Sequence, residues 1–247
     1  MKVIGLIPTR LNSTRLPQKA LLKINNIPLV VHTYKRAKLS KKLNDVYICC
    51  DDKKIKDIAE KFGAKVIMTS KNHNNGTERI NEAYKKLKKK YDFIVDIQGD
   101  EPLVSPYHID DVVNYHIKNK KADIILPTLE IKPTINTNII KVIINKKNEV
   151  MYLSRADLPL SFKKNKNKVL KHLSIISFLP KSLEKFSISK KTYLESIEDI
   201  ELLRALELGM KIKSIKLKGD SFSVDVYDDY KKADLRMSKD KFFKIYK

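Results

Sequence analysis

Short apolar runs rich in β-branched residues alternate with helical segments along the first half of this chain. The runs "KVIGLIP", "DVYICCDD", "AKVIMTS" and "DFIVDIQGDEP" are typical of strands, the last one passing into a loop. The segments "IPLVVHTYKRAKLS", "KKIKDIAEKFG", "GTERINEAYKKLKKK" and "YHIDDVVNYHIKNK" have helical periodicity. Because strands joined through helices pair in parallel, the alternation predicts an α/β fold whose mostly parallel sheet has helices on both faces.

The pattern changes beyond Lys121. The segments "ADIILPTLEI", "NIIKVIINKKNEVMYLSR" and "KHLSIISFLP" are typical of strands, and we expect a hairpin around residues 146–148. The segments "SLEKF" and "SIEDIELLRALELG" predict helices, "KIKSIKLK" a strand and "DDYKKADLRMSKDKFFKIYK" a closing helix. Residues 128–171 have the character of an insertion, in which "SFKKNKNKV" resembles a mobile loop.

Size and composition favour one domain with an excursion, since 247 residues with 42% hydrophobic content can bury one sizeable core. The opening "MKVIGLIPTR" has too few apolar residues for a signal peptide or a membrane span, so we expect no membrane insertion. Cys49 and Cys50 are neighbours, a spacing that favours neither a structural disulfide nor a zinc site. These features predict a cytoplasmic protein.

The formal charge of +22 raises the possibility of nucleic-acid binding. Only seven of the 51 basic residues are arginines, and the lysines are spread through nearly every polar segment. That distribution favours a lysine-rich solvated surface over a nucleic-acid-binding patch. It also makes arginine the scarce cation, so each arginine indicates a need for a planar, bidentate donor.

Three predicted strand exits are polar: "PTRLNSTRLPQK", "HNNGTER" and "QGDEP". Ligands of open parallel sheets bind at such exits. The six glycines are too scattered for a Walker loop or a dinucleotide fingerprint. Phosphate binding would therefore depend on side-chain cations, and Arg10, Arg15 and Lys19 can all turn toward one triphosphate. Asp100 follows an apolar strand and a glycine, where a magnesium ligand would lie.

Each of these features also has a purely structural interpretation. Arg15 could belong to a turn that leads into a helix, and "QGDEP" could be an acidic turn. Glu78 and Arg79 could cap and pair on their own helix. His73 and His172 are interpreted as hydrogen-bonded structural histidines.

The order of the motifs narrows the choice. "IPTRLNSTRLPQKAL", "HNNGTERI", "DIQGDEP", "YLSRADLP", "HLSI", "LESIEDIELLRAL" and "SVDVYDD" together resemble the cytidylyltransferases that activate 3-deoxy-manno-octulosonate (Kdo), from about residue 4 to 233. The resemblance implies a Rossmann-like, mostly parallel mixed sheet of the nucleotide-diphospho-sugar transferase type, with a small antiparallel excursion used in dimerisation. It divides the single domain 1–247 into a nucleotide-binding part of about 1–127, a sugar-binding and dimerisation excursion of about 128–190, and a closing part, 191–247.

The resemblance also implies the reaction and its residues. The sugar's anomeric hydroxyl would attack the α-phosphorus of CTP in a homodimeric enzyme that uses Mg²⁺. The implied catalytic residues are Arg10, Arg15, Lys19, Asp100 and Asp225, with Asp100 and Asp225 as metal ligands. The implied nucleotide-binding residues are Pro8, Thr9, Arg10, Ser13, Arg15, Lys19, Gly76, Thr77, Arg79 and Asp100. The implied sugar-binding residues are Gln98, Arg155, His172 and Glu201, and Asn138 and Lys141 also match family positions.

The chain departs from the family pattern at several positions. Gln18 and Ser223 replace glycines, and Leu202 replaces a glutamine. The family's "HLGIYGY" is "HLSIISF" at residues 172–178. The phosphate and metal groups are kept whereas the sugar side has changed, so the reaction type is better defined than the sugar.

Four hypotheses follow. The first is a CTP-dependent Kdo cytidylyltransferase, and the second is the same chemistry on a related sugar acid such as 8-amino-Kdo or a nonulosonate. The third is a nucleic-acid-binding protein, which only the charge supports. The fourth is a catalytically dead relative, which would be expected to lack a metal carboxylate or a triphosphate cation. The sequence contains all five of these residues: Arg10, Arg15, Lys19, Asp100 and Asp225.

Overall fold

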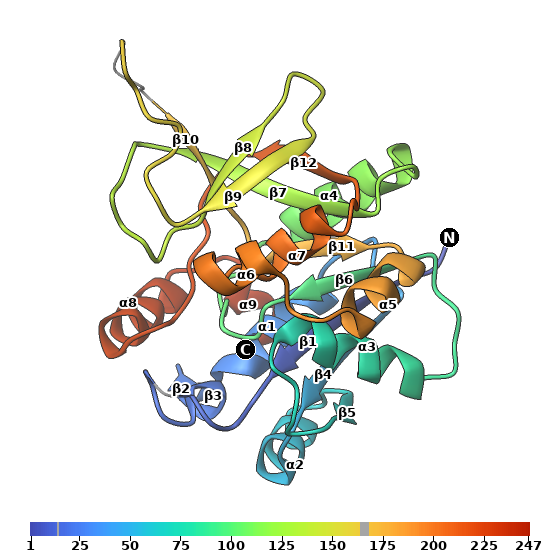
Figure 1. Ribbon diagram of the computed structural model, residues 1–247. Coiled ribbons are helices and arrows are strands. Elements are labelled where there is room, and N and C mark those ends of the chain that lie inside the picture. The colour runs from blue at the N-terminus through green and yellow to red at the C-terminus, as the bar shows by residue number, and fades with distance from the viewer. Residues whose placement is uncertain (14, 164–167) are drawn as a thin grey trace. The chain divides into compact units, whose positions relative to one another are not determined.

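The computed structural model, which describes residues 1–13, 15–163 and 168–247, divides into two units (Figure 1). The first unit consists of Met1–Asp111 and Ser221–Lys247, and the second of Val112–Asp220. One position of the "STRLP" motif, residue 14, and residues 164–167 of the predicted mobile loop lie outside the described residues.

Four parallel strands form the sheet of the first unit, in the order β5-β4-β1-β6. Their bounds are β1 Val3–Thr9, β4 Asp45–Cys50, β5 Val66–Met68 and β6 Phe93–Ile97. All of β6 and most of β1 are buried, as expected for strands with helices on both faces.

Three helices connect these strands: α1 (Leu29–Lys38), α2 (Lys53–Lys61) and α3 (Gly76–Lys86). The chain runs from β1 through α1 to β4 and through α2 to β5, and then returns through α3 to β6 on the other side of β1. Because such crossovers are right-handed, α1 and α2 cover one face and α3 the other. The strand order thus reverses between β1 and β6, and their carboxyl ends form the switch point at which α/β sheets bind ligands.

The two strand exits at this switch point approach each other closely. A Cβ added to Gly99, just after β6, would lie 2.7 Å from the backbone oxygen of Pro8 in β1. Only glycine fits there, so the glycine of "QGDEP" brings the loop after β6 against the end of β1.

The chain's C-terminal segment completes the first unit. Helices α8 (Tyr227–Ser238) and α9 (Phe243–Tyr246) lie in the same unit as the small antiparallel hairpin of β2 (Lys23–Ile24) and β3 (Ile27–Pro28). One apolar cluster unites these elements, and its buried members are Leu16, Ile24, Leu29, Val224, Ala233 and Met237. Residues far apart in sequence are therefore packed around the start of α8.

The second unit is a mixed sheet built on β7 (Ile124–Ile131). Strand β12 (Ile212–Leu217) pairs with it in parallel, and β10 (Val169–His172) and β11 (Ile175–Phe178) pair with it antiparallel. Strand β10 continues to the hairpin of β8 (Lys141–Ile144) and β9 (Val150–Ser154). Helix α4 (Pro106–Lys118) spans the unit boundary, and the helices α5 (Pro180–Ile188), α6 (Tyr193–Glu198) and α7 (Glu201–Glu207) complete the unit.

The predicted α/β class with a mixed, mostly parallel sheet is confirmed, and so is the hairpin around residues 146–148. Three predicted elements are wrong in extent. "KHLSIISFLP" forms two strands instead of one, because the register against β7 shifts between His172, which lies opposite Thr128, and Ser177, which lies opposite Ile125. "SIEDIELLRALELG" is broken where Asp199 adopts a left-handed backbone conformation, with φ of 51°. The closing helix stops at Ser238, before a separate turn of helix.

Candidate active site

Two arginines and a lysine follow strand β1, as the sequence predicts. Arg10 and Arg15 are exposed, and the partly buried Lys19 begins the short 3-10 helix η1 (Lys19–Leu21). Gln18, at a family glycine position, adopts a left-handed conformation with φ of 50°. Its Oε1 accepts a hydrogen bond from Lys54 Nζ at 2.7 Å. The loop therefore makes, with Gln18, the left-handed turn that a glycine could adopt without strain.

Two carboxylates from distant parts of the chain meet at Lys19. Its Nζ lies 2.8 Å from Asp100 Oδ2 and 3.4 Å from Asp225 Oδ1. Arg15 Nη2 lies 2.9 Å from the same Asp225 oxygen. The backbone of the two carboxylate segments is joined as well, because Val224 N–H donates to the Asp100 oxygen at 3.0 Å. The structure thus brings together four of the five predicted catalytic residues, with Arg10 on the same loop.

The "GTER" motif begins helix α3. Asn75 caps it by accepting a hydrogen bond from Glu78 N–H at 2.8 Å, and Glu78 accepts one from Asn74 N–H at 3.2 Å. The capping role considered for Glu78 is therefore confirmed. A Cβ on Gly76 would lie 3.1 Å from Pro8 Cγ and 3.2 Å from Gln98 Nε2. Gly76 thus lets the first turn of α3 pack against the ends of β1 and β6.

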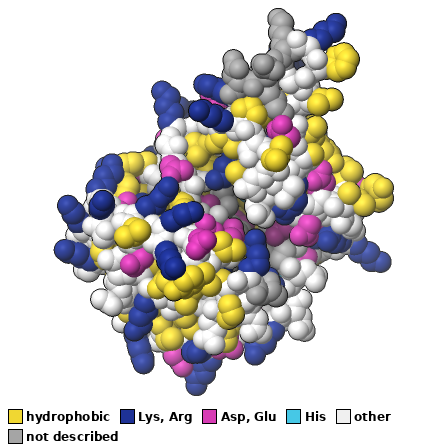
Figure 2. All heavy atoms as spheres, turned by 90° about the vertical axis from the view of Figure 1, so that its left-hand side faces the viewer, with side chains coloured by type: hydrophobic (Ala, Val, Ile, Leu, Met, Phe, Trp, Pro, Cys, Tyr) yellow, Lys and Arg dark blue, Asp and Glu magenta, His cyan; other side chains and the backbone are white. Residues whose placement is uncertain are grey.

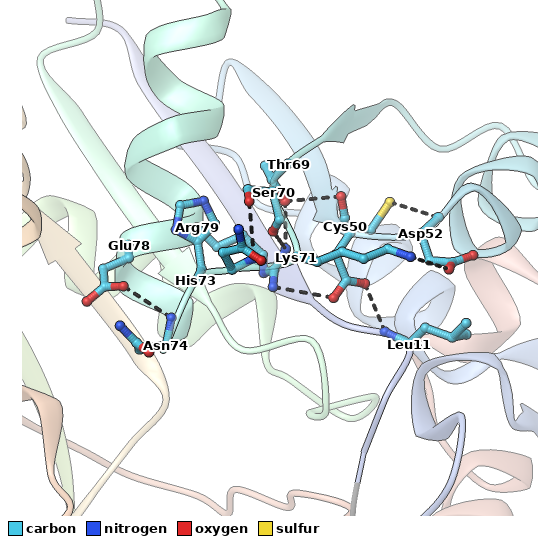
Figure 3. A network of polar contacts seen from close by, with 12 residues as sticks. Leu11, Cys50, Asp52, Thr69, Ser70, Lys71, His73, Asn74, Glu78 and Arg79 are labelled. Carbon is cyan, nitrogen blue, oxygen red and sulfur yellow. Dashed lines mark hydrogen bonds and ion pairs between the residues drawn. The ribbon is translucent and has the colours of Figure 1, made fainter.

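Arg79 is buried beneath this helix end (Figure 3). Its Nη1 donates to Thr69 Oγ1 at 2.7 Å and to the Ser70 oxygen at 3.0 Å. Its Nη2 lies 3.5 Å from Asp51 Oδ2. The guanidinium predicted to contact nucleotide is thus bound to groups of the exits of β4 and β5.

The remaining residues predicted on the nucleotide side have different exposures. Pro8 and Thr77 are buried, and Thr9 and Ser13 are partly buried. The predicted sugar contact Gln98, which follows β6 in the same unit, is also partly buried. Gln98 Nε2 donates to Asp96 Oδ2 at 2.9 Å, which orients its side chain within the first unit. This bond is separate from the lysine and carboxylate cluster.

The other predicted sugar contacts, Arg155, His172 and Glu201, lie in the second unit. Arg155 donates from Nε to the Glu198 oxygen at 2.8 Å, from Nη1 to the Thr137 oxygen at 3.0 Å and from Nη2 to the Asp199 oxygen at 3.1 Å. The guanidinium predicted to bind the sugar is therefore bonded to backbone carbonyls.

Lys141 and His172 also face the interior of the second unit. Lys141 is fully buried, and its Nζ donates to the Asn136 and Arg155 oxygens, both at 2.9 Å. These bonds fix the segment around the exposed Asn138. Removal from water, aided by the charge of Lys171, lowers the pKa of His172 to about 4, so the ring is neutral at pH 7. His172 suits a neutral hydrogen-bonding role better than a charged one.

The two cysteines are free and buried, so the prediction of no structural disulfide is confirmed. Burial raises the pKa of the Cys50 thiol to about 11 and that of Cys49 further, which keeps both unreactive. No group of three or more metal-ligating side chains occurs within residues 1–13, 15–163 and 168–247. A metal would thus need substrate atoms beside the two carboxylates.

Sequence reasoning missed Asp51. Its Oδ1 accepts a hydrogen bond from Leu11 N–H at 3.0 Å, directly beside Arg10. A signal was available, because Asp51 follows β4, and β4 neighbours β1. Carboxylates at adjacent strand exits are candidates for the same site.

A parallel sheet with cations and carboxylates at its switch point defines a nucleotide-handling α/β enzyme. The profile of a family described as cytidylyltransferase matches residues 4–212, and this chain belongs to that family. The resemblance found in the sequence is confirmed.

Named relatives cover nearly the whole chain. A 3-deoxy-manno-octulosonate cytidylyltransferase of Chloroherpeton thalassium is 38% identical over 97% of this chain and 99% of its own length. A mitochondrial protein of that name from Arabidopsis thaliana is 38% identical over 96% and 83%. An 8-amino-3,8-dideoxy-manno-octulosonate cytidylyltransferase of Shewanella baltica is 35% identical over 97% and 100%.

Solved structures agree with these relatives. A CMP:2-keto-3-deoxy-manno-octonic acid synthetase in complex with CTP has a TM-score of 0.91 and 27% identity over 97% of this chain and 99% of that chain. A cytidylyltransferase of Leptospira borgpetersenii, at 21% identity and a TM-score of 0.67 over 97% and 88%, shares the fold. Along the described part of this chain, no helix has the length and apolar character needed to cross a membrane.

Proposed function

We propose that this protein transfers CMP from CTP to Kdo, giving CMP-Kdo and pyrophosphate for lipopolysaccharide or capsule synthesis. The observation that carries the proposal is the convergence of Arg15, Lys19, Asp100 and Asp225 at the exits of β1 and β6. The relatives named for this reaction and the similar structure holding CTP support the choice of nucleotide and sugar.

The proposed reaction is a single displacement at phosphorus. The anomeric oxygen forms a bond to the α-phosphorus, the bond from that phosphorus to the bridging oxygen breaks, and pyrophosphate leaves with the electron pair. The hydroxyl proton passes to solvent. Negative charge grows on the leaving group, so Arg10, Arg15 and Lys19 act by holding and neutralising the phosphates. No covalent enzyme intermediate is needed.

The two carboxylates fit a magnesium site. Asp100 and Asp225 already converge on one cation, the Lys19 ammonium, and two carboxylates completed by substrate phosphates are a common set of protein ligands for Mg²⁺. Asp100 and Asp225 would hold the ion, which when bound neutralises phosphate charge and lowers the pKa of the attacking hydroxyl. Lys19 and Arg15 would then be released toward the phosphates.

The other site residues that the family resemblance implies are proposed by the same reasoning. Pro8, Thr9, Ser13, Gly76 and Thr77 would surround the nucleotide, with Arg79 behind them. On the sugar side we propose Gln98, Arg155, His172 and Glu201. For Arg155 to bind a sugar carboxylate, its guanidinium must exchange at least one of its carbonyl partners, because three of its nitrogens are bonded to them.

The proposed enzyme is a cytoplasmic homodimer that works as one cytidylyltransferase domain. Two buried, unpaired cysteines suit a reducing compartment. Among its described residues, the excursion has five strongly exposed large apolar side chains, Ile135, Met151, Leu160, Phe162 and Ile188, which a second copy would cover.

A second candidate is the same reaction on 8-amino-Kdo. It is favoured by relatives of that name, which are 35–36% identical over nearly the whole chain. A nonulosonate substrate has no such relative among these. Nucleic-acid binding gains no support, because on the face drawn in Figure 2 the Lys and Arg side chains are interspersed with acidic and apolar ones.

The test is pyrophosphate release with CTP, UTP, ATP and GTP, each combined with Kdo, 8-amino-Kdo and a nonulosonate. We expect turnover with CTP and one of the first two sugars. Turnover that is equal with all four nucleotides would reject the cytidylyltransferase assignment. Absence of turnover with every pair would favour a catalytically dead relative.

A further inference from the structure

The carboxylate of Asp51 holds the backbone of the loop that bears Arg10, Arg15 and Lys19. Asp51 follows β4, whose Cys50 lies opposite Thr9 of β1 in the parallel register. Its Oδ1 accepts from the Leu11 N–H at 3.0 Å. Because Leu11 is the next residue after Arg10, this bond fixes the main chain where the first phosphate cation leaves the sheet.

A buried arginine balances the charge of Asp51. Arg79 Nη2 lies 3.5 Å from Asp51 Oδ2, and the two side chains are only 4% and 11% exposed. Arg79 is itself held by Thr69 and Ser70, which follow β5, as Figure 3 shows. A buried carboxylate without a partner would be costly, and a free one would repel a triphosphate. Because Arg79 neutralises Asp51, the Asp51 carboxylate can bind the loop backbone without repelling a triphosphate.

The other end of the same loop has a second contact from the segment after β4. Lys54, in the first turn of α2, donates to Gln18 Oε1 at 2.7 Å. Gln18 carries the left-handed turn that leads into Lys19. Residues 51–54 thus contact the loop at Leu11 and again at Gln18, on either side of Arg15.

We propose that Asp51 is a positioning residue for CTP binding, acting through the Leu11 amide, with Lys54 as its partner at Gln18. This role rests on the proposed function of the cation cluster. Asp51 touches no phosphate. It restricts the loop so that Arg10, Arg15 and Lys19 are already oriented when the triphosphate arrives, which reduces the ordering cost of binding.

The main test compares Asp51→Ala and Asp51→Asn in the full-length protein. Asparagine keeps an oxygen for the Leu11 N–H, whereas alanine removes it, and both remove the charge beside Arg79. Hydrogen exchange of the Leu11 amide is measured without ligand, and CTP affinity by calorimetry. Asp52→Asn is the control, because it removes a neighbouring charge while asparagine still caps α2.

We expect Asp51→Ala to lose protection at Leu11 and to bind CTP about tenfold more weakly, as loss of a hydrogen bond to a charged acceptor predicts. Asp51→Asn should stay within about threefold of the wild type, although both variants should melt at lower temperature. Unchanged affinity or unchanged Leu11 exchange in Asp51→Ala would overturn the proposal. Equal weakening in both variants would show a purely structural charge pair and would overturn it too.

A second pair of variants avoids buried groups in case Asp51→Ala fails to fold. Lys53 and Lys54 are both exposed neighbours at the start of α2. Lys54→Ala should weaken CTP binding about threefold and Lys53→Ala should not, because only Lys54 contacts the loop. Equal CTP affinities of these two variants would show that the contact of Lys54 with Gln18 does not restrict the loop, and would reject that part of the proposal. Failure of the wild type to bind CTP would reject the proposed function itself, without reference to any variant.

Discussion

The cation cluster of the first unit and the second-unit residues at family positions, Arg155 and Lys141, use similar side chains in opposite ways. Lys19, Arg15, Asp100 and Asp225 pair with each other, and each keeps some exposure to solvent. Arg155 and Lys141 instead bond backbone carbonyls of their own unit. Charged side chains that are paired only with each other can be exchanged for ligand groups at low cost, whereas those that satisfy carbonyls also hold the fold.

This contrast qualifies the argument from scarce arginines. Four of the seven are used inside the protein: Arg36 and Arg155 on carbonyl oxygens, Arg79 on Asp51 and Ser70, and Arg204 on Glu195 at 2.7 Å. Planar multiple donation was indeed needed at these positions, but by the fold. The scarce arginines therefore indicate positions that need several planar hydrogen bonds. Only an arginine that is accessible to solvent can make those bonds to a ligand.

The strongest test of the contrast is Asp100→Asn. It should reduce turnover at least about a thousandfold while leaving the fold intact, because a partly exposed strand-exit carboxylate is kept for a cation. Pyrophosphate release and circular dichroism measure the two effects. The exposed Asp111→Asn is the control, and wild-type turnover by Asp100→Asn would remove the metal assignment.

Arg15→Ala should have the next largest effect. We expect kcat/KM for CTP to fall about a hundredfold, because charge-assisted phosphate contacts strengthen as the transition state forms. Steady-state kinetics at saturating sugar would show it. Lys118→Ala, which removes an exposed lysine of α4, should change nothing, and equal damage from both would mean that only general charge matters.

Acid should weaken both units, and the second one more, because it contains His172 as well as His116. Burial lowers the pKa of His32 in the first unit and of His116 in the second to about 4. Each ring donates from Nε2 to a carbonyl, of Ile24 and Ala122, and the lowered pKa keeps it neutral at pH 7. The unfolded chain binds these protons near pH 6.5 and the folded chain only near 4, so the stabilisation is complete above 6.5 and is lost as the pH falls.

The loss should be about 2 kcal/mol for each histidine at pH 5 relative to pH 8. Urea unfolding at the two pH values measures it. His32→Gln and His116→Gln should each reduce the pH dependence by a similar amount. A change confined to one variant would contradict the expectation that both histidines contribute.

The smallest expected effect concerns the altered strand "HLSIISF". Ser177 bonds His116 Nδ1 at 2.7 Å, and Phe178 is fully buried, so these replacements serve packing. Two replacements are left, the partly buried Ser174 and the buried Ile176, and of these only Ile176 lacks a hydroxyl group that the family residue has. Ile176→Tyr should raise kcat/KM for Kdo relative to 8-amino-Kdo by about tenfold or less, since one hydroxyl contact is restored. Equal ratios in both proteins would mark the replacements as silent.

The sequence predicts the fold class well because periodicity reports burial, which is local. It fails where the backbone departs from a regular element, at the left-handed Asp199 and at the register shift between β10 and β11. For the site, spacing identifies the cations and carboxylates, since strand exits gather at one edge. It cannot show that Arg79 and Arg155 bond groups of the protein itself, because their partners lie elsewhere in the chain. Asp51 could be predicted from its place after β4, next to β1, although its partners Leu11 and Arg79 lie elsewhere in the chain.

The most direct test of the central claim, that Asp100 and Asp225 would hold Mg²⁺ for CTP binding, is CTP affinity measured by calorimetry with and without Mg²⁺. Mg²⁺ should tighten CTP binding at least about tenfold in the wild type and less than about threefold in Asp100→Asn, because the ion needs both carboxylates. An equal gain in both proteins would contradict the account.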